Sequence, residues 1–210
     1  MRWLKVTTFL ACLIPLARLG WKAYQGLLGA NPIEVITHST GDWTLIFLLL
    51  TLTITPLRKL ACQPWLIKFR RMFGLYAFFY GCLHFLTYIW LDKFFDFHEM
   101  LVDIAKRKFI TVGFAGLLLM LPLAVTSTAG WIRRLGGKRW NLLHRLIYFS
   151  AIAGVIHYLW LVKADRSKPL EYAAVLAVLL GYRLVIAVMP KRTPAKAAAL
   201  SRPRAQAPQG

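Results

Sequence analysis

The stretch that decides the fold is residues 142–162, which read LLHRLIYFSAIAGVIHYLWLV. Its charged and imidazole side chains are limited to His144, Arg145 and His157. A helix that crosses a membrane needs roughly 17–25 mostly apolar residues. The stretch therefore predicts a membrane span that carries two histidines.

Five further apolar blocks surround this one, at residues 3–28, 43–57, 72–91, 109–125 and 170–189. Hydrophobic residues make up 58% of the 210-residue chain and the mean hydropathy is +0.54, whereas a soluble domain has about 45–50% apolar residues. The first block is the least regular, but no small-x-small cleavage site follows it, so we expect a retained helix rather than a removed secretory signal. The sequence thus predicts an all-α integral membrane protein, a six-transmembrane helix bundle.

The distribution of charged residues predicts how the helices are oriented in the membrane. Residues 58–71 and 133–139 and the tail after residue 190 carry lysine and arginine without any acid, while all eight acids lie in the other three connections or beside them. Lysine and arginine favour the cytoplasmic side, which predicts that both termini are cytoplasmic. The same placement explains the net charge of +19 without nucleic acid, for which no recognition motif is present.

The sequence predicts a single domain followed by a tail. Residues 1–190 are expected to form one transmembrane domain and residues 191–210 a basic, disordered cytoplasmic tail. Residues 94–108 mix aromatic and charged side chains, which predicts a short interfacial helix on the outer side. Cys12, Cys62 and Cys82 form neither CxxC nor CxxCH, which excludes a zinc ribbon, a thioredoxin-like site and covalently attached c-type haem.

Three of the five histidines, His84, His144 and His157, lie inside apolar blocks. Ionisable groups at membrane depth usually mark function, although a histidine can also join two helices by a hydrogen bond. Neutral imidazole is an axial ligand of haem iron, and three such residues on two predicted helices favour b-type haem. A proton relay in a small transporter, or a structural subunit without cofactor, is the alternative.

The spacing of these histidines constrains the arrangement. His144 and His157 lie about 20 Å apart along a helix, enough for two haems, but roughly 140° apart around it. We therefore expect helix tilt, or a local change near Gly154, to turn both into the bundle. Depth favours pairing His84 with His157.

Three more residues are weaker candidates. His98 follows His84 on the same helical face and is a candidate further ligand, although charged residues intervene. Arg145 is a candidate partner of a haem propionate, but snorkelling to the surface explains it equally. His38 is expected to be solvated or interfacial, in the first outer connection.

Several segments resemble the MsrQ family, the haem-binding membrane subunits of the periplasmic protein-methionine-sulfoxide reductase system. Residues 137–148 (GKRWNLLHRLIY) and 156–160 (IHYLW) resemble its fifth helix, and 70–75 with 83–84 its third. Residues 29–32 with His38 and 40–41 resemble its first outer loop, and 54–57 the end of its second helix. The similarity extends over roughly residues 5 to 190.

The resemblance implies a ferric-reductase-like transmembrane domain in the bacterial inner membrane. It implies one or two b-type haems ligated by His84, His144 and His157, with FMN as a further candidate cofactor. It also implies electron transfer from a cytosolic flavin reductase or quinol to MsrP, a periplasmic molybdopterin methionine sulfoxide reductase, with no sulfoxide reduction by this chain itself. From the residues themselves, no Gly-rich nucleotide fingerprint is present, so a separate donor must supply the electrons.

Overall fold

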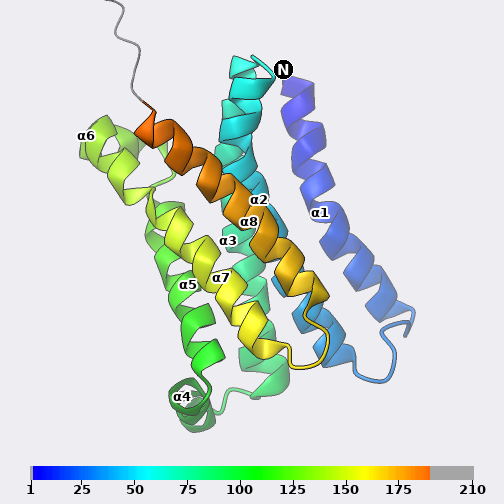
Figure 1. The fold of residues 1–210 in the computed structure, drawn as a ribbon. Helices are drawn as coiled ribbons and strands as arrows, with labels where there is room; N and C mark the ends of the chain where they lie inside the picture. Colours follow the sequence, from blue (N-terminus) through cyan, green and yellow to red (C-terminus); the bar gives the residue numbers. More distant parts are fainter. Residues whose placement is uncertain (1, 190–210) are drawn as a thin grey trace, which may run out of the picture.

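The computed structural model describes residues 2–189, and in that range it is built from helices (Figure 1). They follow one another as α1 (Arg2–Tyr24), α2 (Pro32–Leu60), the 3-10 turn η1 (Pro64–Leu66), α3 (Ile67–Thr87), the π turn η2 (Tyr88–Asp92), α4 (Phe97–Lys106), α5 (Lys108–Val125), α6 (Ala129–Leu143), α7 (Leu146–Leu161) and α8 (Ser167–Val188). The tail predicted at 191–210 lies outside the described residues.

The six-helix prediction is confirmed. Five spans in residues 2–189 are long and apolar enough to cross a membrane, and α6 with α7, bent by 41° at their junction, makes up to six. The start of α1 and the end of α8 lie at the same end of the bundle, opposite α4 (Figure 1), as an even number of crossings requires. Which end faces the cytoplasm stays a prediction.

The core lies between α2, α3, α5 and α7. Leu48, Leu52 and Tyr80 are at most 1% exposed, and the ring of Phe47 stacks on that of Tyr80 at 5.3 Å. The outermost helix, α1, is joined to α3 by the Tyr80 hydroxyl, which donates to the carbonyl of Cys12 at 2.9 Å. Most of the surface of α1 is left for lipid.

The second helix begins earlier than the apolar block suggested. Asn31 caps α2, its side-chain oxygen accepting from the N–H of Glu34 at 3.3 Å, and Pro32 occupies the first turn. Both residues are favourable at these positions. His38 is consequently part of α2, and its predicted place in a connecting loop was wrong.

The fifth predicted span is broken. α6 ends at Leu143 and α7 begins at Leu146, so His144 and Arg145 form the turn between them. Gly136, with φ of 73°, adds a second kink within α6. The change in direction that the histidine spacing demanded therefore occurs at His144 itself and not at Gly154, which lies inside α7.

The short helix predicted within 94–108 is present as α4. The Asp96 side chain accepts from the N–H of Glu99 at 2.9 Å and caps it. Lys93, before the helix, forms a 2.7 Å ion pair with Asp103 inside it. Leu101 lies on the exposed side, so α4 has the amphipathic character of an interfacial helix.

Candidate functional site

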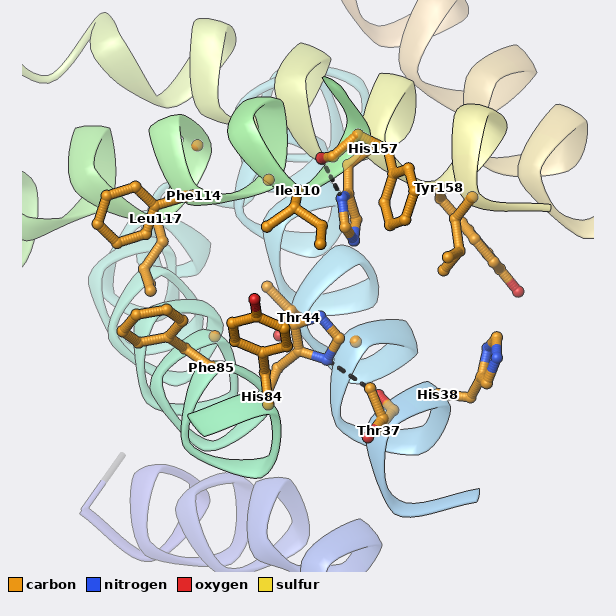
Figure 2. Close-up of a pocket in the computed structure, with 18 of the residues that line it drawn as sticks. Thr37, His38, Thr44, His84, Phe85, Ile110, Phe114, Leu117, His157 and Tyr158 are labelled. Carbon is orange, nitrogen blue, oxygen red and sulfur yellow. Dashed lines mark hydrogen bonds between the residues drawn. The ribbon is translucent and has the colours of Figure 1, made fainter. Parts of the chain in front are cut away.

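A cavity of about 460 Å³ opens between α2, α3, α5 and α7, within the range of about 300–1,000 Å³ typical of cofactor pockets. Its wall is mostly apolar, with Phe85, Phe114 and Leu117 among the lining residues (Figure 2). His84 from α3 and His157 from α7 enter it from opposite sides. The structure therefore brings together two of the three predicted ligands.

The two imidazoles face each other across the cavity (Figure 2). Their ring centroids are 6.0 Å apart and their planes meet at 80°. Depth along the chain predicted this pairing, and the structure places the two rings side by side; that they share a ligand stays a prediction.

Each imidazole is bonded to the backbone of a neighbouring helix. His84 Nδ1 lies 3.0 Å from the carbonyl oxygen of Thr37 on α2, and His157 Nδ1 lies 2.7 Å from that of Phe109 on α5. A carbonyl oxygen only accepts, so both Nδ1 atoms carry the proton. In the neutral rings, Nε2 then keeps its lone pair, which is the form that binds a metal.

The spacing of the rings fits a metal held between them. A metal–imidazole bond is about 2 Å long, which places the centroids of two rings on opposite faces of one metal roughly 6 Å apart. Residues 2–189 hold no cluster of three or more histidine, cysteine or acidic side chains able to bind a bare ion. Two imidazoles at this spacing would suit the iron of a haem, whose remaining ligands belong to the haem itself.

The structure does not bring His144 to this site. It lies at the end of α6, half-buried, with its ring stacked on Trp140 at a centroid distance of 3.8 Å. Its Nε2 is 3.1 Å from the Thr126 hydroxyl, which also donates to the carbonyl of Pro122 at 2.6 Å. A hydroxyl has one proton, so in this arrangement His144 Nε2 donates to Thr126 and Nδ1 carries the lone pair.

The weaker candidates are also apart from the paired imidazoles. His38 is half-buried at the wall of the cavity, with Nε2 3.8 Å from the Glu34 carboxylate. His98 on α4 and Arg145 at the α6–α7 turn are exposed and do not line the cavity.

Sequence reasoning missed two kinds of residue. Gly41 and Gly113 lie against the imidazoles of His84 and His157, and nothing in the apolar pattern distinguishes them from packing glycines. Arg183, inside the sixth apolar block, did leave a signal, because a lone arginine at membrane depth usually has a defined partner.

Residues 40–155 match the family described as the ferric reductase like transmembrane component. The chain is 54% identical over 183 residues to the protein-methionine-sulfoxide reductase haem-binding subunit MsrQ of Herminiimonas arsenicoxydans, which covers 86% of this chain and 84% of that protein. It is also 54% identical over 189 residues to the subunit of the same name in Rhodospirillum rubrum, covering 90% and 91%. The chain belongs to the MsrQ family. MsrQ membership confirms the resemblance seen in the sequence, and the ferric-reductase-like match covers α3, α5 and most of α2 and α7. Of the two candidate imidazoles, His84 lies inside the matched segment and His157 lies just beyond its end.

Proposed function

We propose that this chain is the haem-binding membrane subunit of a protein-methionine-sulfoxide reductase, and that it carries electrons across the bacterial inner membrane to a periplasmic MsrP-like molybdopterin enzyme. The observation that carries the proposal is the pair His84 and His157, whose Nε2 lone pairs are left free at a separation that suits one metal. The names of the relatives, which are haem-binding subunits of such a reductase, support it.

In this proposal His84 and His157 would hold one b-type haem, which would supply the one-electron chemistry. The chain's own residues bind and orient. The carbonyls of Thr37 and Phe109 fix the tautomer of each imidazole and increase its basicity, as hydrogen-bond partners of metal-bound histidines commonly do. The apolar wall around Phe85 and Phe114 keeps water away from the group.

His144 remains our candidate for a second haem. It lies just before the start of α7, whereas His157 lies in the last third of that helix. Ligation would use Nδ1, or else Nε2 after release from Thr126, and would move the Trp140 ring. His98 and Arg145 stay candidates for further ligation and for a propionate, respectively, without support from their exposed positions.

The electron donor is a cytosolic flavin reductase or quinol in this proposal, with FMN as a candidate additional cofactor. The support is indirect: residues 1–210 contain no Gly-rich nucleotide fingerprint, which favours a separate donor. The predicted cytoplasmic face is rich in lysine and arginine, a suitable surface for an acidic partner.

A proton relay is the second candidate, and the hydrogen bonds argue against it. A relay needs each imidazole to pass its proton to another titratable group. Here the Nδ1–H groups of His84 and His157 both donate to backbone carbonyls. A backbone carbonyl carries no proton that it could pass on. For His84 and His157 the arrangement therefore favours a fixed ring orientation over proton transfer.

The test is the difference spectrum, dithionite-reduced minus oxidised, of the full-length protein purified in detergent. We expect α and Soret bands of b-type haem. His84→Ala and His157→Ala should lose the haem between them, and His144→Ala should lower the haem content only if a second haem is present. His38→Ala should keep it all. A folded, colourless wild-type protein after haem supplementation would overturn the proposal.

A further inference from the structure

We propose that Gly41 and Gly113 are positioning residues, each of which seats one imidazole and fixes the direction of its ring plane. The inference rests on the proposed haem ligation by His84 and His157. Each seat consists of a backbone carbonyl and a glycine four residues later on the same helix.

On α5 the seat is formed by Phe109 and Gly113. His157 Nδ1 donates to the carbonyl of Phe109 at 2.7 Å, and a Cβ at Gly113 would lie 2.6 Å from that same Nδ1 and 3.0 Å from Cγ and Cε1. Residues four apart lie on one face of a helix, one turn above each other. The ring therefore occupies the volume that any side chain at 113 would need.

On α2 the same pattern recurs with different residues. His84 Nδ1 donates to the carbonyl of Thr37 at 3.0 Å, and a Cβ at Gly41 would lie 3.1 Å from the Cε1 atom and 3.2 Å from the Nδ1 atom of His84. The two seats are on separate helices that both line the cavity, and the imidazoles that they hold enter it from opposite sides (Figure 2). The same arrangement at both seats indicates that each glycine makes room for the imidazole. Close helix packing alone would not place an imidazole over the glycine at both positions.

Other glycines that line the cavity lack this arrangement. A Cβ at Gly81 would meet the methyl of Met120 at 3.1 Å and Leu117 at 3.2 Å, and one at Gly154 would meet Leu45 at 2.8 Å. These positions allow the helices to approach. Gly74, on α3 and not among the residues that line the cavity, offers a control, because a Cβ there would meet Thr51 at an ordinary contact distance of 3.7 Å.

The consequence is a fixed angle between the two ligand planes. Each ring is held at Cβ, at Nδ1 and along the glycine face, so it cannot rotate freely about its Cβ–Cγ bond. The planes meet at 80°. In ferric haem with two imidazole ligands, nearly perpendicular planes leave the iron d orbitals almost degenerate and give a highly anisotropic low-spin electron paramagnetic resonance signal, whereas parallel planes give a rhombic one.

The experiment records this signal from the full-length, haem-loaded ferric protein, in the His144→Ala background so that any second haem is absent. We expect the highly anisotropic signal. Gly113→Ala should displace the His157 ring from the Phe109 carbonyl and either convert the signal toward the rhombic type or release the haem. Gly74→Ala should keep both haem and signal. Gly41→Ala, with a longer contact, should retain haem and shift the signal less.

The outcomes separate the two proposals. A wild-type chain without haem would overturn the proposed function. A loaded chain with a rhombic signal, or Gly113→Ala and Gly41→Ala variants with the wild-type signal, would overturn the seats and leave haem binding intact. If Gly113→Ala does not fold, the milder Gly41→Ala variant decides.

Discussion

Arg183 on α8 supplies a hydrogen bond that α2 lacks at Pro56. Pro56 lies inside α2 and has no N–H, so the carbonyl of Leu52, four residues earlier, loses its helical donor. Arg183 Nη2 donates to that carbonyl at 2.5 Å, and Nη1 donates to the Tyr148 hydroxyl at 2.6 Å. Leu52 is fully buried, and no water in the bilayer core would satisfy its carbonyl otherwise.

This contact predicts a coupling between Arg183 and Pro56. A hydrogen bond from a charged group contributes about 1.5–3 kcal/mol, while the average bond between membrane helices contributes about 0.6 kcal/mol. We expect Arg183→Met to lower the free energy of unfolding by about 2 kcal/mol. Pro56→Ala supplies the missing N–H, so in that background the same change should cost about 1 kcal/mol or less.

The assay is a double-mutant cycle, by reversible unfolding of the full-length protein in mixed detergent and dodecyl sulfate micelles. Tyr148→Phe serves as the control, because it removes the other acceptor of Arg183 and leaves Pro56 and Leu52 unchanged. Its effect should be the same in the wild-type and Pro56→Ala backgrounds. Equal losses on Arg183→Met in both backgrounds would refute the reasoning.

Three further predictions concern other parts of the bundle. Ser150→Ala should lower the free energy of unfolding, measured in the same micelles, by about 1 kcal/mol. The reason is that the buried Ser150 hydroxyl donates to the Gly116 carbonyl at 2.5 Å and joins α7 to α5. An unchanged free energy of unfolding would contradict that role. Tyr80→Phe should increase hydrogen exchange in α1 without changing α5, since its bond to α1 is lost; unaltered exchange in α1 would show that other contacts hold it. The hydrogen bond from Lys93 lowers the pKa of Asp103, and the bond to Asp103 raises the pKa of Lys93. The ion pair should therefore stabilise α4 fully at any pH above the ordinary carboxyl pKa of about 3.9 and below the ordinary lysine pKa. In acid, this stabilisation should disappear as the pH falls through the lowered pKa of folded Asp103. In base, it should disappear only above the ordinary lysine pKa. Protection of α4 amides in Asp103→Asn should lack the acid transition; the wild-type pH profile in that variant would refute this account.

The apolar blocks were enough to predict six spans, because a chain in lipid must bury every backbone polar group in continuous helices. Boundaries set by polar residues were less accessible. α2 extends back to Pro32 through a polar first turn capped by Asn31, and the fifth block is divided at His144 and Arg145. Hydropathy measures transfer to lipid and does not detect a cap or a turn.

The sequence by itself determined that the chain enters a membrane, that it belongs with haem-binding subunits and that His84 and His157 are candidate ligands. Only the tertiary structure placed these two imidazoles 6.0 Å apart and left His144 beside Trp140. The physical reason is that a helix apolar on all sides has no periodic stripe to show which face is inward. The Nδ1 partners, moreover, are backbone carbonyls 47 and 48 residues away along the chain, and a carbonyl is common to every residue, so only packing selects which one an imidazole meets.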